Sequence, residues 1–86
     1  MVVVGETVYL HCFASGEPKP SFQWLRNGKA IQDDPMHSSY ALLPRENGLE
    51  LKIYAISHRE AGLYTCRCTN RVGIAQYTVQ VIVNGK

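Results

Sequence analysis

Histidine and cysteine are among the residue types in this chain whose side chains could carry catalysis or bind a metal ion. A hydrolytic site needs a nucleophile beside a base, and the histidines are His11, His37 and His58. We expect His11 to point outward from an alternating strand, His37 to lie in an irregular polar segment and His58 to lie at a polar corner. Because these places should lie far apart, the sequence predicts no catalytic residue, and we expect a protein that is not an enzyme.

This short chain contains three cysteines, Cys12, Cys66 and Cys68. This count predicts one bridge with one cysteine left over, and it leaves open which two are paired. Cys66-x-Cys68 lacks the second pair of ligands that a zinc ion needs. The glycines occur singly, so no phosphate-binding loop is present either. We therefore expect no metal and no cofactor.

Composition restricts the class of protein. The 86 residues are enough for one small domain, and 45% hydrophobic with 19% charged residues is a globular balance. The net charge of +2 is scattered, which argues against nucleic acid as a partner. Apolar runs are far too short to cross a bilayer, so direct membrane insertion is not expected. We expect residues 1–86 to be a single domain excised from a multidomain chain, with Met1 as an added initiator.

Short alternating strands separated by turn residues must position these side chains. Hydrophobic and polar residues alternate with period two, and Asn27-Gly28 and Asn47-Gly48 are strong hairpin signals. No segment has a sustained helical period. The pattern predicts an all-β antiparallel sandwich. The expected strands cover residues 8–14, 22–26, 30–31, 40–43, 49–54, 63–69 and 74–83, with a polar corner at 56–62.

The spacing of Cys12, Trp24 and Cys66, with Tyr64 two residues before the second cysteine, resembles the immunoglobulin fold. The segment from Glu60 to Cys66 is similar to the Asp-x-Gly-x-Tyr-x-Cys signature of that family, with Glu60 where Asp is usual. The flanking positions resemble the intermediate, or I-set, subclass; they include Gly5, Leu10, Gly16-x-Pro18-x-Pro20, Leu51-x-Ile53 and Cys66-x-x-x-Asn70-x-x-Gly73. The resemblance implies an immunoglobulin-like, two-sheet antiparallel Greek-key sandwich of seven or eight strands.

The same resemblance implies a structural role for the central residues. Cys12 and Cys66 would form a disulfide between the sheets, Trp24 would pack on its sulfurs, and Tyr64 would form the tyrosine corner. Leu51, Ile53 and Cys68 would complete the core. Cys68 stands where the family commonly has alanine, so a small buried filler is the plain interpretation. Redox exchange with Cys66 is the alternative.

Alternation also predicts what the outer faces carry. The sheet containing residues 8–14 and 49–54 would expose three aromatic residues, which makes this face a candidate protein-contact surface. Its residues are Tyr9, His11, Phe13, Lys52 and Tyr54, with Glu50 beside them. The alternative is cross-strand pairing that only strengthens the sheet. The opposite sheet would expose a polar set made of Gln23, Leu25, Thr65, Arg67, Thr69, Gln76, Thr78 and Gln80.

The resemblance therefore implies protein–protein recognition, with neighbouring domains of the same chain and a protein ligand as partners, and with homophilic contact as an option. Two environments remain open. The first is the ectodomain of a cell-surface adhesion molecule or receptor. The second is a cytoplasmic scaffold of muscle or cytoskeleton, where such domains serve as elastic spacers or docking sites. An ectodomain would contain the Cys12–Cys66 disulfide, whereas a cytoplasmic scaffold would contain three free thiols.

Overall fold

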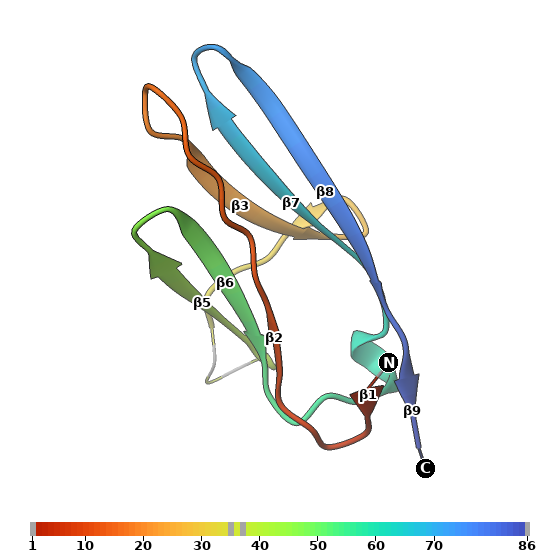
Figure 1. Ribbon diagram of the computed structural model, residues 1–86. Helices are drawn as coiled ribbons and strands as arrows, with labels where there is room; N and C mark the ends of the chain where they lie inside the picture. Colours follow the sequence, from red (N-terminus) through yellow and green to blue (C-terminus); the bar gives the residue numbers. More distant parts are fainter. Residues whose placement is uncertain (1, 35, 37, 86) are drawn as a thin grey trace.

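The computed structural model describes residues 2–34, 36 and 38–85, and its regular structure there is β-strand apart from one turn of 3-10 helix (Figure 1). The predicted all-β fold is confirmed. The elements in chain order are β1 (Val2–Val3), β2 (Val8–Leu10), β3 (Ser21–Arg26), β4 (Lys29–Ala30), β5 (Tyr40–Arg45), β6 (Gly48–Ile53), η1 (His58–Glu60), β7 (Gly62–Asn70), β8 (Gly73–Val81) and β9 (Val83–Asn84).

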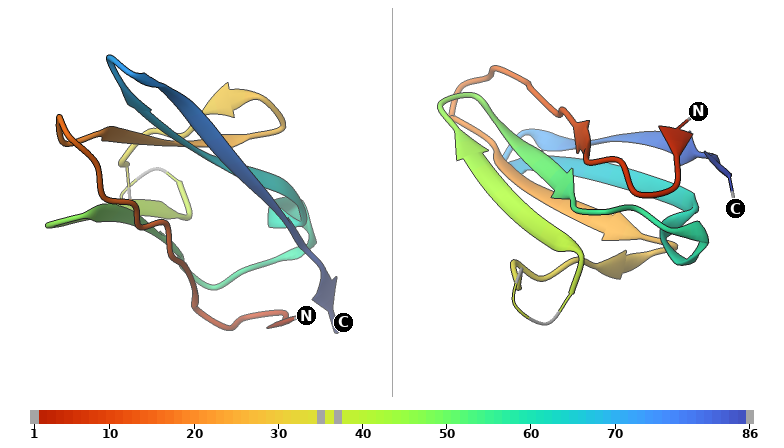
Figure 2. Two further views of the ribbon diagram at one scale, coloured as in Figure 1. Left: turned by 45° about the horizontal axis from the view of Figure 1, so that its top comes forward. Right: turned by 90° about the horizontal axis from the view of Figure 1, so that it is seen from below.

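The strands form two packed antiparallel sheets, as an immunoglobulin-like sandwich requires (Figure 2). One sheet has the order β2-β6-β5 and the other the order β4-β3-β7-β8. A separate parallel pair joins β1 to β9, with Val2 opposite Val83, at the end of the molecule where both termini lie (Figure 1). Consequently β8 and β9 together form one long edge, interrupted at Ile82.

Three of the expected strands end more than one residue away from the observed end. The first long strand is formal β-structure only over β2, yet an isolated bridge between Phe13 and Gly48 continues the register in which Leu10 faces Leu51. The alternation therefore persists to Phe13. The strand expected at 40–43 runs on to Arg45. The strand expected at 74–83 stops at Val81 because pairing passes to β1 at this point, where the amide of Val2 donates to the carbonyl of Ile82 at 3.0 Å.

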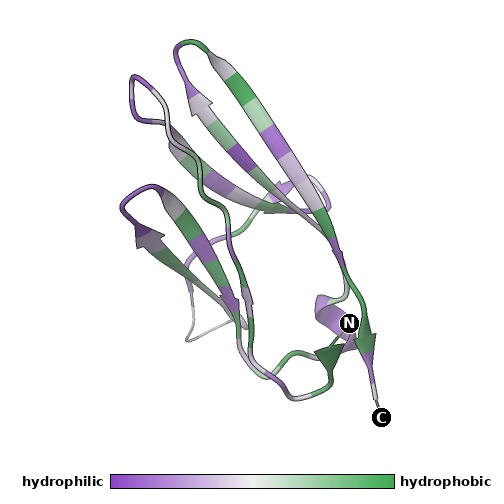
Figure 3. Cartoon of the chain, in the orientation of Figure 1, coloured by the Kyte–Doolittle hydropathy of each residue, from purple (hydrophilic) through white to green (hydrophobic). Residues whose placement is uncertain are grey.

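The core lies between the sheets and is built from the inward side chains of both. Hydrophobic residues of β6 alternate with charged ones, which Figure 3 shows as green and purple bands. Leu51, Ile53 and Tyr64 have no exposed surface, and Trp24 is almost fully buried. Burial of these side chains provides the main driving force for closing the sandwich.

Two hairpins depend on their glycines. Asn27 and Gly28 have φ of 49° and 85°, which is the left-handed backbone that an Asn-Gly hairpin turn between β3 and β4 uses. Gly48 has another role. A Cβ atom placed on it would lie 2.2 Å from the carbonyl oxygen of Cys12, because the chain after β2 passes directly over it.

Candidate protein-contact surfaces

The cysteines divide into a bonded pair and a single thiol. The sulfurs of Cys12 and Cys66 are bonded, with 6.3 Å between the Cα atoms. Cys68 is a buried free cysteine outside the central cluster, and its sulfur lies 3.6 Å from the carbonyl oxygen of Ala75. Within the described ranges, no three His, Cys, Asp or Glu side chains gather to hold a metal ion.

The two histidines that the structure describes, His11 and His58, occupy unrelated positions. His11 is exposed beyond the end of β2, and its Nδ1 lies 2.5 Å from Oε2 of Glu50. His58 begins η1, with its Nε2 3.2 Å from the carbonyl oxygen of Gly85. His37 lies outside the described residues. The structure therefore does not bring His11 and His58 together.

The corner before β7 is organised by a relay of hydroxyl groups. An Arg26 N–H donates to the Tyr40 hydroxyl at 2.9 Å, the two tyrosine hydroxyls are 3.0 Å apart, and Tyr64 donates to the carbonyl oxygen of Glu60 at 2.5 Å. Since the Tyr64 proton is used at Glu60, Tyr40 must donate to Tyr64. Burial, followed by the Tyr40 contact, raises the pKa of Tyr64, which keeps this hydroxyl protonated.

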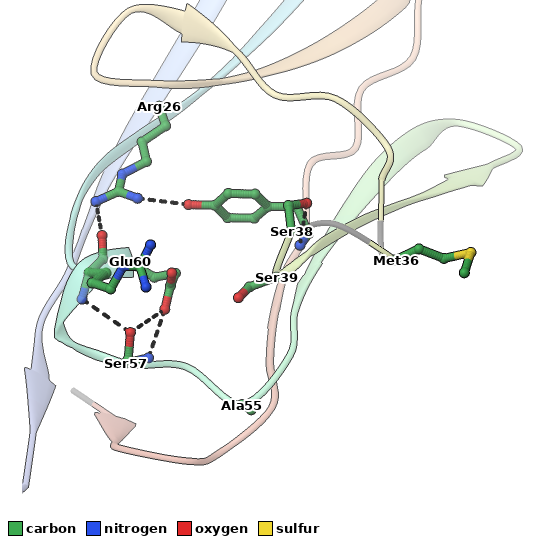
Figure 4. A pocket seen from close by; sticks show the side chains of 9 residues that line it. Arg26, Met36, Ser38, Ser39, Ala55, Ser57 and Glu60 are labelled. Atoms are coloured by element: carbon green, nitrogen blue, oxygen red, sulfur yellow. Dashed lines mark hydrogen bonds between the residues drawn. The ribbon is translucent and has the colours of Figure 1, made fainter.

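The cavity beside this corner, of about 690 Å³, is polar (Figure 4). Several of its polar side chains make structural hydrogen bonds. Ser57 and Glu60 form a reciprocal capping box around η1, and Arg26 also donates to the carbonyls of Arg59 and Ala61. These hydrogen bonds of Ser57, Glu60 and Arg26 serve the packing of the corner, and among the described side chains only Arg26 Nε is a buried polar atom without a hydrogen-bond partner.

The outer face of β2 and β6 brings Tyr9, Lys52 and Tyr54 together. The Lys52 ammonium lies 5.4 Å from the ring centre of Tyr9 and 4.5 Å from that of Tyr54. Hydrogen bonding to Tyr9 is the main cause that raises the pKa of Lys52, so the amine stays charged. Each ring is held in place by the same cation, and both rings remain exposed.

His11 and Phe13 continue this face past the end of β2. Their rings stack with centroids 6.0 Å apart and planes 15° from parallel. The phenyl ring of Phe13 is exposed. The five residues Tyr9, His11, Phe13, Lys52 and Tyr54, here termed the aromatic face, thus form a continuous surface along one strand and its neighbour.

Glu50 departs from the expected exposure. It belongs to the outer side of β6 but is only 7% exposed, because His11 and Arg45 close over its carboxylate from both sides. The hydrogen bond from Arg45 lowers the pKa of Glu50 most, and the nearby His11 lowers it further. Alternation identified its side of the sheet correctly but could not reveal this cover.

Leu25 is the second departure. Alternation placed it outward with polar neighbours, yet it is 5% exposed. Its strand, β3, is an interior strand in which Ala30 of β4 and Thr65 of β7 flank Leu25 on either side. Leu25 is thus buried at an interior position of the sheet although it does not point toward the core.

A further exposed apolar surface lies on β8, at Ile74, Tyr77 and Val79, and was missed by sequence reasoning. Every residue from Gly73 to Gln80 is exposed. Tyr77 and Val79 are 59% and 42% exposed although they pair with the buried Cys66 and Tyr64 and share their inward side. A sequence signal existed, because residues 72–85 contain no charged residue and no proline.

A lateral cavity of about 210 Å³ connects the two surfaces. His11 and Phe13 line one wall, Tyr77 and Val79 line the other, and Trp24 with the Cys12–Cys66 bridge also line it. Here the two sheets stand open at the side where β2 and β8 are the edge strands, and Figure 1 shows these two strands on opposite layers. The aromatic face and the β8 edge are therefore neighbours around one apolar opening.

No helix in the described part of the chain is long and apolar enough to cross a membrane.

Comparison with known proteins agrees with this architecture. Palladin from Rattus norvegicus is 37% identical over 83 residues, which is 95% of this chain and 13% of palladin. ADAMTS-like protein 1 from Mus musculus is 38% identical over 80 residues, 93% of this chain and 4% of that protein. The chain thus spans only a small part of the curated relatives that it matches.

Solved structures give the same result. A chimeric titin Z1Z2 structure superposes with a TM-score of 0.89 at 27% identity, covering 99% of this chain and 84% of that one. A structure of the titin M10–obscurin-like 1 immunoglobulin complex gives 0.86 at 28% identity, covering 96% and 82%. The model of the immunoglobulin I-set domain matches residues 1–83. Since that match takes in nearly the whole chain, the protein belongs to the immunoglobulin I-set domain family.

Proposed function

We propose that this domain is a non-catalytic protein-interaction module and that the aromatic face is the surface by which it contacts a protein partner or a neighbouring domain. The observation that carries the proposal is the group of exposed rings on one outer face, Tyr9, Phe13 and Tyr54. The immunoglobulin-like domain family consists of non-catalytic domains. Aromatic rings dominate binding energy at protein interfaces because they bury a large area with few rotatable bonds.

The rings of the aromatic face are ordered before any partner arrives. Lys52 holds Tyr9 and Tyr54 beneath one ammonium group, and His11 stacks on Phe13. A side chain already held in position loses less conformational entropy on binding. The same contacts also strengthen the sheet, so sheet reinforcement without binding is the competing explanation.

The proposal is tested by replacing Tyr9, Phe13 and Tyr54 together with serine. Binding would be measured by calorimetry against isolated immunoglobulin domains, beginning with the obscurin-like 1 domain, because a domain similar to this one occurs in a complex of titin with obscurin-like 1. We expect binding to be lost while the melting temperature changes little. Leu63→Ser, on the other sheet, is the control and should bind normally. If the triple variant binds at full strength, the aromatic face is not a binding surface and its contacts only reinforce the sheet.

For the environment, we propose the ectodomain of a cell-surface adhesion molecule or receptor, supported by the bonded Cys12–Cys66 pair. The alternative, a spacer or docking domain in a cytoplasmic scaffold of muscle or cytoskeleton, is favoured by the similarity to palladin and titin. A thiol count on the native protein, denatured without reductant, separates the two. One reactive thiol supports the ectodomain, and three support the scaffold.

A further inference from the structure

The four edge strands of the two main sheets, β2, β5, β4 and β8, are not equally protected against pairing with another strand. An edge strand presents unpaired N–H and C=O groups, and proteins usually block it with short length, charge or proline. Among the described strands, β2 and β4 are short, three and two residues, and β4 begins with Lys29. The edge strand β5 ends with Pro44 and Arg45. Each of these three edges carries a blocking feature.

The fourth edge, β8, carries none of these features. It is nine residues long and lacks both charge and proline. It is flanked by β7 on one side only, and β1 pairs with the same edge just past its end, at Val83 and Asn84. That pairing shows that the edge is accessible to an added strand. It also leaves the segment from Gly73 to Val81 free.

Besides its unpaired backbone groups, β8 presents apolar side chains that a partner strand could cover. Ala75, Tyr77 and Val79 lie on the inward side, and Tyr77 and Val79 form one wall of the lateral cavity. A strand placed beside β8 would direct alternate side chains over this opening, toward Phe13 and His11. Both the backbone and the apolar surface would then be covered in one step.

We infer that this chain forms a two-fold dimer in which β8 pairs with β8 of a second copy in antiparallel register, making one continuous sheet of eight strands from the two β4-β3-β7-β8 sheets. A two-fold interface requires a surface that is complementary to itself. Identical charged strands would repel one another, whereas β8 is uncharged, and the nearest charged residues in sequence, Arg71 and Lys86, stand beyond its ends.

The sequence of β8 suits such a register. Centred on Tyr77, antiparallel pairing sets Ala75 opposite Val79 on the inward side and Gln76 opposite Thr78 on the outward side. The small side chain of Ala75 would then lie opposite the branched side chain of Val79, and the amide of Gln76 opposite the hydroxyl of Thr78. The two Tyr77 side chains meet at the axis, where cross-strand aromatic contacts are favourable. This dimer is formed by the β8 edge; it adjoins the aromatic face at His11 and Phe13 but makes no use of Tyr9 or Tyr54.

Sedimentation equilibrium of the 86-residue protein over micromolar to millimolar concentrations tests the dimer. We expect the mass to rise with concentration from 9.6 kDa toward twice that value. Tyr77→Lys should remain monomeric throughout, because it sets two like charges against each other at the axis. Leu63→Lys makes the same change in an exposed residue of β7, away from the edge, and should dimerise like the parent.

Amide hydrogen exchange gives a second readout on the unmodified chain. Alternate amides of β8, those pointing away from β7, should be protected more strongly as concentration rises, while β5 amides should not change. A constant mass of 9.6 kDa at the highest concentration, or a dimer that survives Tyr77→Lys, would overturn the inference. If β8 pairs only with a strand of a different protein, the mass would stay constant, which is the first of these two results.

Discussion

The indole nitrogen of Trp24 donates a 2.9 Å hydrogen bond to the carbonyl oxygen of Leu49 and so joins the two sheets through the core. Trp24 lies on β3, beside the bridged cysteine Cys66 on β7, and Leu49 lies on β6. The tryptophan therefore contributes both a large buried ring and a polar tie between the layers.

Trp24→Phe should lower the free energy of unfolding by about 2 kcal/mol or more, because it leaves the buried Leu49 carbonyl without this donor and opens a small void. Urea unfolding followed by circular dichroism measures the change. Tyr77→Phe, an aromatic substitution at an exposed site, is the control and should move the midpoint very little. Equal stability of the two variants would contradict the sheet-joining role.

Tyr64→Phe should destabilise the fold by about 1–3 kcal/mol, since it removes the donor to Glu60 and leaves the Tyr40 hydroxyl without its acceptor. Because both tyrosines belong to one relay, the double variant with Tyr40→Phe should cost less than the sum of the two single changes. Chemical denaturation of the three variants completes the cycle. Strict additivity would show that the hydroxyl relay is not a coupled unit.

Gly48→Ala should destabilise the domain by about 1–3 kcal/mol, because the added methyl group would lie 2.2 Å from the Cys12 carbonyl oxygen and 2.4 Å from a ring carbon of Phe13. The matched change Gly73→Ala has nothing within 4 Å and should leave stability within about 0.5 kcal/mol. Thermal unfolding of both variants makes the comparison. Equal stability of the Gly48→Ala and Gly73→Ala variants would contradict the close contact between Gly48 and the Cys12 carbonyl oxygen.

Glu50 should contribute to stability in a pH-dependent way. Arg45 and His11 lower its pKa in the folded state below the ordinary value of 4.5. The contribution is therefore present above that ordinary pKa and is lost as pH falls through the lowered one. Glu50→Gln should have a flatter melting-temperature profile on the acid side. Glu46→Gln removes an exposed carboxylate nearby and should keep the parent profile. A Glu50→Gln profile parallel to the parent's would contradict the ion-pair assignment.

Much of the fold could be read from local patterns. The alternation from Val8 to Phe13 indicated which side of the strand faces the core, and the spacing of Cys12, Trp24 and Cys66 indicated the family that the comparisons show. Asn27-Gly28 marked a hairpin because few residue pairs tolerate its backbone conformation. These features depend on the chain's own covalent geometry and on period two, so they can be recognised without coordinates.

Exposure could not be read in the same way. Leu25 points outward and is buried, Glu50 points outward and is covered, and Tyr77 points inward and is exposed. Alternation determines only the side of the sheet on which a side chain lies. Whether anything covers that side depends on strands distant in sequence, namely β4 and β7 around Leu25, β2 and β5 around Glu50, and the open lateral cavity beside Tyr77. The sequence alone determined the sandwich and its core, and the tertiary arrangement of its edges decided which surfaces are free to bind.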